Sequence, residues 1–417
     1  MNAKLISIVA VIIIVIGGLA AALALSGGSD DNGSDNVFED MSGNMVAMPE
    51  EINSIALIGV GTLRHFSHLG LASKICSSDQ LAKGATYGSN TYMYAFDEYW
   101  NQDSIKSHSG ARQAVNLESI LKCNNGGKPD VLVVVDTIAQ GDGNKATLQA
   151  VKDSGIAVFE VQSVQELMTS DCKISPLYEK QLLCIGKAFG VEKRAHELID
   201  GVNGILEEVK SFRGTSVSSK AYVGGLTVSS ARGLNLTSPA YPPFILAGTQ
   251  NIVEQGSSAL DAGGTEAGTS VNIEKLVRII DDSDKFEMFV DPAGWRLQKG
   301  LCPGDDLVST ALYNKGITTG TVVTPFHSYG MEYDNILVNC YLVAQTLYDL
   351  DSKMIREKID AVYELYYGAA ATNSDGVKIF DEMGDWYYKA THCRFGETVT
   401  FGNGAITMTD GVTVLQR

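Results

Sequence analysis

The segment from Val191 to Arg213 constrains the fold more than any other part of this sequence. Spacings of three and one place its apolar residues on one stripe of an α-helix. The residues on this stripe are Ala195, Leu198, Ile199, Val202, Ile205, Leu206, Val209 and Phe212. The helix would rise about 34 Å, and burying the stripe would contribute on the order of 12–24 kcal/mol before conformational entropy is subtracted. Gly201 and Gly204 each disfavour it by up to ~1 kcal/mol, so a broad surface must pack beneath it.

A weak internal repeat flanks this helix. Before it, Asn116-Leu-Glu118 opens a short helical pattern that leads into the apolar run 131–135 and Asp136. After it, Asn272-Ile-Glu274 opens a similar pattern that leads into the run 286–290 and Asp291. The repeat predicts two similar α/β lobes with central sheets, bridged by the one long helix. We place the lobes at 37–172 and 216–368, with the connecting helix region at 173–215.

The N-terminus carries an apolar run from Leu5 to Leu25, preceded by Lys4. It is long enough to span a bilayer, which takes about 20 residues. We expect residues 1–28 to be an uncleaved transmembrane anchor with the rest of the chain outside the cell. The competing interpretation is a signal segment that is cleaved near residues 20–26. The Gly/Ser/Asp-rich stretch 29–36 reads as a flexible linker.

Charge and cysteine content exclude some functions. The net charge of −17 argues against nucleic-acid binding, which needs a basic face. Seven cysteines are present without a CxxC motif, so the spacing supports neither a disulfide framework nor a zinc site. The sequence also lacks a P-loop and a recognisable Ser/His/Asp or Cys/His constellation. We therefore expect no enzymatic activity and no cofactor.

The first lobe opens with two strand-like pieces between Val37 and Pro49, which predict a hairpin around Ser42-Gly43-Asn44. A buried strand follows at Ile52–Ile58. Gly59-Val-Gly-Thr62 then turns into a helix, with Thr62 as the expected N-cap. Backbone N–H groups at this helix start could accept an anionic ligand. An ordinary tight turn explains the glycines equally well.

This opening resembles the periplasmic binding proteins for iron–siderophore complexes and cobalamin. In that family a D-x-x-G-x-x-V-x-x-P hairpin precedes a first strand, a turn and a helix ending in LG, as in MPEEINSIALIGVGTLRHFSHLGLASKI here. The later NLESIL and KPDVLVV resemble a second family signature. The resemblance covers about residues 37–368. It implies an extracytoplasmic protein that holds an iron(III) chelate or a corrinoid in a cleft between its lobes and delivers it to an ABC permease dimer with its ATPase.

Aromatic residues crowd the Gly/Ser/Asn-rich stretch Thr86–Trp100. Tyr92 and Tyr94 are candidate ligand contacts, because tyrosine combines area with a polar tip; the alternative is that the rings fill the lobe. His65 and His68 are three apart on the first helix and could share a face. Too few other ligands stand nearby for a metal site, so we expect ordinary, partly exposed helix residues.

The second lobe supplies candidate contacts from loops after its strands, where open α/β sheets place ligands. Arginine suits the carboxylate or catecholate oxygens of an anionic chelate; the alternative for each arginine is a surface ion pair. The candidates are Thr62 from the first lobe and Arg232, Tyr241, Trp295, Arg296, His327 and Tyr329 from the second.

Glu118 and Glu274 occupy matching positions of the repeat. The resemblance implies that one exposed glutamate on each lobe forms salt bridges to arginines of the permease dimer. The alternative needs no partner, because a carboxylate at a helix start gains about 0.3–1 kcal/mol from the helix dipole.

Residues 369–417 extend past the region of resemblance. Thr398–Leu415 alternates like a β-hairpin, with Asn-Gly and Asp-Gly turns. Two other functions stay open for the chain as a whole. One is a receptor for a bare metal ion or a small oxyanion, although the six histidines are dispersed. The other is an enzyme on a nitrogenase-like α/β frame, although the cysteine spacing offers no cluster ligands.

Overall fold

The computed structural model describes residues 36–79, 91–93, 115–141, 143–214, 220–226, 233–260, 268–296, 300–326 and 332–415. The predicted anchor or signal segment and nearly all of the linker lie outside these ranges. None of the helices within them combines the length and the apolar composition that crossing a bilayer requires. The chain divides into two compact units, Met1–Val37 and Phe38–Arg417.

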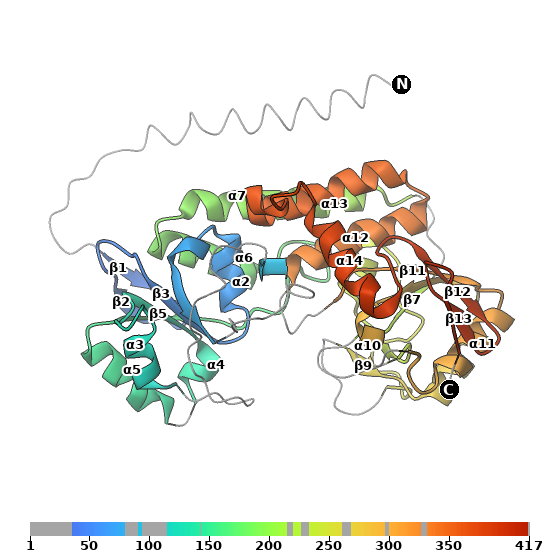
Figure 1. The fold of residues 1–417 in the computed structure, drawn as a ribbon, viewed down its shortest axis with the longest axis horizontal. Coiled ribbons are helices and arrows are strands. Elements are labelled where there is room, and N and C mark those ends of the chain that lie inside the picture. The colour runs from blue at the N-terminus through green and yellow to red at the C-terminus, as the bar shows by residue number, and fades with distance from the viewer. Residues whose placement is uncertain are drawn as a thin grey trace, which may run out of the picture. The chain divides into compact units, whose positions relative to one another are not determined.

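A four-stranded parallel sheet forms the core of the first half, in the order β4-β3-β5-β6 (Figure 1). Its strands are β3 (Ile55–Ile58), β4 (Ile75–Ser78), β5 (Val131–Val135) and β6 (Ala157–Val161). All five residues of β5 are buried, because helices cover both faces of the sheet. This explains why β5 is apolar throughout rather than alternating.

The helices of this half are α2 (Thr62–His68), α3 (Leu117–Lys122), α4 (Asp136–Ala139), α5 (Asn144–Asp153) and α6 (Pro176–Ala188), with a 3₁₀ turn at Ala72–Lys74. Phe66 and Leu182 join one apolar layer with Val133. Ile120 and Leu148 join the opposite layer. The sheet is therefore sandwiched between α2 with α6 and α3 with α5.

The predicted hairpin is confirmed as β1 (Val37–Glu39) and β2 (Met45–Ala47). Asp40 shapes its turn, because its Oδ1 accepts hydrogen bonds from the backbone N–H groups of Ser42 and Asn44, each at 2.9 Å. Its Oδ2 accepts from the N–H of Glu160 at 3.1 Å. This last bond fastens the hairpin to β6.

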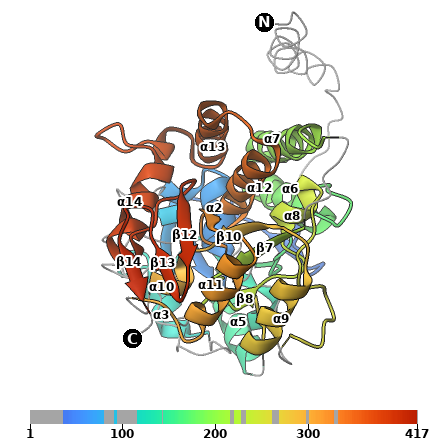
Figure 2. The ribbon, with the colours of Figure 1, turned by 90° about the vertical axis from the view of Figure 1, so that its right-hand side faces the viewer.

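A second sheet forms the core of the other half, in the order β14-β13-β12-β11-β10-β7 (Figure 2). Strands β7 (Ala221–Gly224), β10 (Glu287–Val290) and β11 (Thr319–Val322) are parallel. Strands β12 (Thr398–Gly402), β13 (Ala405–Thr407) and β14 (Thr413–Leu415) continue the sheet antiparallel. The predicted C-terminal hairpin is thus confirmed, and it extends the sheet beyond β11. Among the described residues, no strand of one sheet pairs with a strand of the other.

The remaining elements surround the second sheet or connect the halves. They are β8 (Leu236–Thr237), α8 (Pro242–Ala247), β9 (Thr269–Ser270), α9 (Ile273–Asp282), α10 (Ala293–Arg296), α11 (Asp305–Asn314), α12 (Tyr333–Tyr348), α13 (Ser352–Tyr367), a 3₁₀ turn at Gly368–Ala371, and α14 (Ile379–Thr391).

The long helix is confirmed as α7 (Glu192–Ser211). The predicted stripe is buried except for Ile205 and Phe212, which are half-buried. The helix packs on α6 of the first half and on α8, α12 and α13 (Figure 1). Close packing explains the glycine at position 201, because a Cβ there would lie 2.6 Å from both Cδ atoms of Leu365 on α13. Gly204 has no neighbouring atom within 4 Å of such a Cβ.

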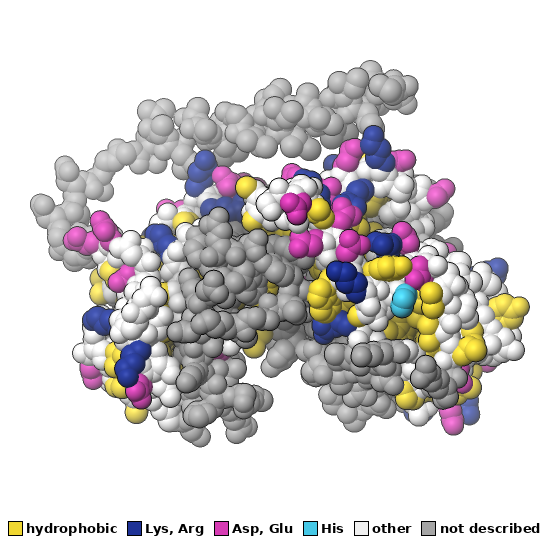
Figure 3. Space-filling view, viewed as in Figure 1, with side chains coloured by type: hydrophobic (Ala, Val, Ile, Leu, Met, Phe, Trp, Pro, Cys, Tyr) yellow, Lys and Arg dark blue, Asp and Glu magenta, His cyan; other side chains and the backbone are white. Residues whose placement is uncertain are grey.

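Acidic and basic side chains are mixed over α7 and α13 on the face shown in Figure 3. Lys358 of α13 forms an ion pair with Glu208 of α7 at 2.7 Å. Lys193 and Glu197 pair along α7 at 3.7 Å. Charges of both signs are therefore interspersed on these helices, and some of them pair.

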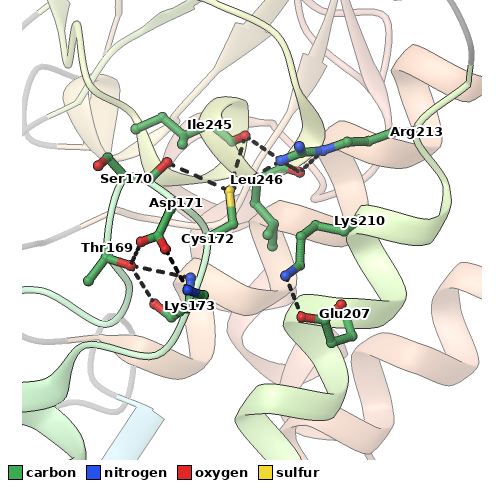
Figure 4. Close-up of polar contacts among 10 residues, drawn as sticks. All are labelled: Thr169, Ser170, Asp171, Cys172, Lys173, Glu207, Lys210, Arg213, Ile245 and Leu246. Carbon is green, nitrogen blue, oxygen red and sulfur yellow. Dashed lines mark hydrogen bonds and ion pairs between the residues drawn. The ribbon is translucent and has the colours of Figure 1, made fainter.

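Arg213, two residues past the end of α7, joins both halves (Figure 4). Arg213 donates from Nε to the Leu246 carbonyl at 2.9 Å and from Nη2 to the Ile245 carbonyl at 2.8 Å, which closes the end of α8. Its Nη2 also lies 3.2 Å from the Sγ of Cys172, in a turn that follows β6. Cys172 is buried and has a positive φ of 61°. The end of α7 is thus held to segments from both halves.

Candidate functional site

A buried ion pair joins the two halves. Arg64, on α2, donates from Nη2 to Oε1 of Glu332, the residue at the start of α12, at 2.9 Å. The two side chains are 5% and 1% exposed. The Arg64 guanidinium also lies over the ring of Tyr92, 4.7 Å from its centroid. Burial raises the pKa of Glu332 to about 8, against the opposing effect of Arg64.

The two histidines of α2 are fully buried, so the prediction that they are partly exposed is wrong. The Nδ1 of His65 lies 2.9 Å from the Gly61 carbonyl and its Nε2 lies 3.2 Å from the amide nitrogen of Gln181. A carbonyl accepts and an amide nitrogen donates, so His65 is neutral with its proton on Nδ1. Burial lowers the pKa of His65 to about 4.

His68 belongs to the same buried cluster. Its Nε2 lies 3.0 Å from the hydroxyl of Tyr367, which donates to Oδ2 of Asp334 at 2.8 Å. Burial lowers the pKa of His68 as well. Within the described ranges, no group of three or more His, Cys, Asp and Glu side chains is arranged to hold a metal ion. His65 and His68 contact Gln181 of α6, Tyr333 of α12 and Tyr367 of α13, so they lie at the junction of α2 with these helices.

The carboxyl ends of strands in both sheets carry carboxylates, half-buried at Asp79 and buried at Asp291. Asp79 follows β4 and accepts the N–H of Gly59 at 3.1 Å. Asp291 follows β10 and accepts the N–H groups of Ala293 and Phe326, each at 2.8 Å. Burial raises the pKa of Asp79 to about 6 and that of Asp291 to about 8. Strand carboxyl ends are where open α/β sheets place ligands.

A second arginine lies among aromatic rings on the other half. The Arg296 guanidinium is 5.0 Å from the ring centroid of Trp386 and 5.9 Å from that of Tyr387, both on α14. The main influence on the pKa of Tyr387 is burial, which raises it; three charged groups have smaller effects. Arg296 lowers the pKa of Tyr387, whereas Asp291 and Glu332 raise it.

Sequence reasoning missed α14, and with it Trp386 and Tyr387. A signal was present, since Ile379, Phe380, Met383 and Tyr387 recur at helical spacing and are all buried.

The candidate residues fall into three groups. Tyr92 lies under the Arg64 guanidinium, and Arg296 lies beside the rings of Trp386 and Tyr387. Thr62, Tyr241 and Trp295 are buried in local structure. Candidates outside the described residues are Tyr94, Arg232, His327 and Tyr329.

The buried group has structural contacts. Gly61, with φ of 87°, is the N-cap of α2 in place of the predicted Thr62, whose hydroxyl donates to the Gly59 carbonyl at 2.8 Å. The Tyr241 ring packs edge-on against Phe244, with centroids 4.9 Å apart. Trp295 donates from Nε1 to Oδ2 of Asp305 at 2.8 Å.

The two matching glutamates have the same local geometry. Asn116 caps α3 by accepting the N–H of Ser119 at 2.9 Å, and Asn272 caps α9 by accepting the N–H of Lys275 at 3.1 Å. Glu118 and Glu274 are therefore the second residues of their helices, and both are exposed. Figure 2 places α3 and α9 away from α7 and α13. Glu118 pairs with Lys122 at 2.8 Å, which lowers the pKa of its carboxyl.

Comparison with known proteins identifies the fold. No family model matches the sequence, and no curated protein sequence is similar to it. An ABC transporter solute-binding protein from Sulfurospirillum deleyianum is 17% identical, with a TM-score of 0.54 over 85% of this chain and 100% of that chain. A periplasmic solute-binding protein from Veillonella parvula is 14% identical, with a TM-score of 0.55 over 83% and 98%.

A third structure is the molybdate periplasmic binding protein MolA of a Haemophilus influenzae ABC transporter, bound to molybdate. It is 14% identical, with a TM-score of 0.52 over 80% of this chain and 98% of that chain. At such identities the likeness concerns the fold, and each of these chains is matched over nearly its whole length. The protein therefore has the two-lobed α/β fold of ABC transporter solute-binding proteins.

Proposed function

We propose that this protein is the extracytoplasmic substrate-binding protein of an ABC importer. The observation that carries the proposal is the architecture: two separate sheets bridged by α7, shared with solute-binding proteins over nearly their full length. The N-terminal segment would anchor the protein at the outer face of the cell membrane, or would be cleaved to release it.

The proposed ligand is an iron(III) chelate such as a siderophore complex, or a corrinoid. Support comes from the half-buried Arg296, which lies beside the rings of Trp386 and Tyr387 on the second half. Aromatic faces and guanidinium groups suit a large ligand that combines flat apolar surface with anionic oxygens. The ligand would lie in the cleft between the halves, next to the strand ends that carry Asp79 and Asp291.

A bare metal ion or a small oxyanion is the second candidate ligand. MolA, which has the same fold, was solved with molybdate. The guanidinium of Arg296 suits an oxyanion as well. A bare metal is less well supported, because the described residues contain no metal-holding group of His, Cys, Asp and Glu. An enzyme on a nitrogenase-like frame has no supporting observation among them.

Glu118 and Glu274 are the proposed contacts to the permease dimer, which works with its ATPase. Both are exposed at the second position of an Asn-capped helix, one on each half. Charged pairs across such an interface mainly set register and encounter rate.

A ligand titration tests the proposed function. Tyrosine and tryptophan fluorescence of the full chain is followed while ferric chelates, cobalamin, molybdate and free metal ions are added separately. We expect saturable quenching by a ferric chelate or by cobalamin. A response to molybdate or to free metal alone would move the ligand to the second class. No response to any of them would contradict a binding protein for these ligands.

A further inference from the structure

Three arginines lie over aromatic rings of α14. Two of them also bond to carboxylates of the same helix, each at 2.8 Å. These two are Arg356, which lies over Phe380 and bonds to Asp381, and Arg394, which lies over Tyr388 and bonds to Asp385. Their charges are therefore balanced within the second half.

Arg296 is the third of these arginines, and no carboxylate pairs with it in the part of the chain that the structure describes. It is half-buried, and its buried Nε has no hydrogen-bond partner there. Asp291, five residues earlier, uses its two oxygens to accept the backbone N–H groups of Ala293 and Phe326, each at 2.8 Å. In a chain with a net charge of −17, Arg296 thus has N–H donors that no described residue uses.

Aromatic rings are the contacts that hold the Arg296 guanidinium. Its central carbon lies 5.0 Å from the ring centroid of Trp386, which is half-buried, and 5.9 Å from that of Tyr387, which is fully buried. The two rings pack against each other with their centroids 5.0 Å apart. The backbone at Arg296 is fixed as well, because Trp295 of α10 donates from Nε1 to Asp305 at 2.8 Å. Both sides of the contact thus belong to packed parts of the second half.

The chemistry of a stacked guanidinium indicates what it binds. Stacking on a ring uses the face of the guanidinium and leaves its N–H edge free. That edge matches the paired oxygens of a carboxylate, a catecholate or an oxyanion such as molybdate. Arg296 ends α10, which follows β10, and the carboxyl ends of strands are where open α/β sheets place ligands.

We propose that Trp386 is a positioning residue for ligand binding, and that its ring holds the Arg296 guanidinium in place for an acidic oxygen group of the ligand. This inference rests on the proposed function and deepens it in two ways. It makes the ligand an anion rather than a neutral corrinoid. It also gives residues 369–417 a role in binding, because α14 lies beyond the region of resemblance.

Equilibrium dialysis of the full chain tests the ligand class, because it does not depend on the fluorescence of Trp386. The probes are ferric citrate and molybdate, which are anions, and cyanocobalamin, which is neutral. We expect the unmutated chain to bind at least one of the anions. Binding of cyanocobalamin alone would overturn the inference and leave the binding function standing. Binding of none of the three would overturn both.

Substitutions of Trp386 test the positioning role. Trp386→Leu should weaken binding of the anion about 2- to 30-fold, the range expected for a cation–π contact. Trp386→Tyr should retain most of the affinity, because a tyrosine ring also attracts a cation. Equal affinity in Trp386→Leu and in the unmutated chain would show that the ring does not position Arg296.

Tyr388→Leu is the matched control on the same helix. It removes the ring beneath Arg394, which keeps its bond to Asp385, so affinity for the anion should be unchanged. A loss as large as that of Trp386→Leu would mean that any damage to α14 weakens binding, and the specific role of Trp386 would be lost.

A double-mutant cycle separates positioning from direct contact with the ligand. Arg296→Ala should weaken binding of the anion, and adding Trp386→Leu should then have no further effect, because the ring acts only through the guanidinium. A further loss as large as in the unmutated chain would overturn the proposal. Circular dichroism checks that each variant is folded, and Trp386→Met replaces Trp386→Leu in both comparisons if the latter does not fold.

Discussion

Two regions differ in where their polar side chains find partners: the buried junction of α2 with α12 and α13, and the exposed starts of α3 and α9. At the junction, Arg64 finds its carboxylate partner on a segment 268 positions away, and both are almost fully buried. At the helix starts, Asn116 and Asn272 cap their own helices three residues on, and Glu118 and Glu274 remain exposed. The junction is therefore sensitive to changes of charge, whereas the helix starts can change partners at little cost in stability.

The largest loss of stability is expected when Arg64 is removed from the junction. Arg64→Ala leaves the Glu332 carboxylate buried without its ion-pair partner, which costs about 3–5 kcal/mol. Urea unfolding measures this loss. Lys220→Ala is the matched control, because the Lys220–Glu254 pair is exposed (48% and 75%) and is expected to contribute about 0–1 kcal/mol.

A double variant separates charge from packing. Arg64→Met combined with Glu332→Leu removes both charges and should recover most of the lost stability. If Arg64→Ala lowers the free energy of unfolding by no more than Lys220→Ala does, the junction is not more sensitive to a change of charge than the exposed surface is.

Lowering the pH is expected to cause the second largest loss of stability at the junction. Burial lowers the pKa of His65 from about 6.5 to about 4, so the unfolded chain takes up a proton at a higher pH than the folded chain does. The stability due to neutral His65 is present above pH 6.5 and is lost as the pH falls toward 4, on the order of 3 kcal/mol. Unfolding free energies of the unmutated chain and of His65→Gln, measured from pH 7 to pH 4, give the difference. A slope that is the same in both proteins would contradict this role.

The two glycines of α7 should respond with opposite signs. Gly204→Ala should stabilise the protein by up to ~1 kcal/mol, because nothing lies near the added methyl group and alanine favours the helix. Gly201→Ala should destabilise it by about 1 kcal/mol, because the methyl group meets Leu365. Thermal unfolding of the pair checks this. Equal shifts would mean that α13 does not pack on α7 as described.

The smallest effect on stability is expected at the helix starts. Glu118→Ala and Glu274→Ala should each cost less than about 1 kcal/mol, the size of the helix-dipole interaction. Ligand affinity should be unchanged, and uptake by cells should fall if both glutamates contact the permease. Glu192→Ala removes an exposed first-turn acid of α7 and is the control. If uptake is unchanged when Glu118→Ala and Glu274→Ala are combined, the two residues have no docking role. If the combined variant loses affinity for the ligand, they contact the ligand instead.

Local patterns made the helix starts and α7 predictable. The stripe of α7 is a repeated spacing within one segment, and each Asn cap is a contact between neighbours. The C-terminal hairpin follows in the same way from alternation around Asn403-Gly404 and Asp410-Gly411.

The junction could not be predicted, because its contacts join distant segments. No local pattern around Arg64 in the sequence indicates that Glu332 is its partner. The histidines of α2 look like surface residues until α12 and α13 cover them. Asp136 and Asp291 end matching strands, yet only Asp291 is fully buried, because the backbone N–H groups of Ala293 and Phe326 close around its carboxylate.

Native mass spectrometry tests the central claim most directly. The full chain is mixed with the chelate or corrinoid that quenches its fluorescence, transferred intact, and then unfolded to release what it holds. The account predicts one ligand per chain, recovered with its mass unchanged, because the proposed function is binding and delivery without a chemical step. A ligand released with an altered mass, or no complex at any ligand concentration, would contradict it.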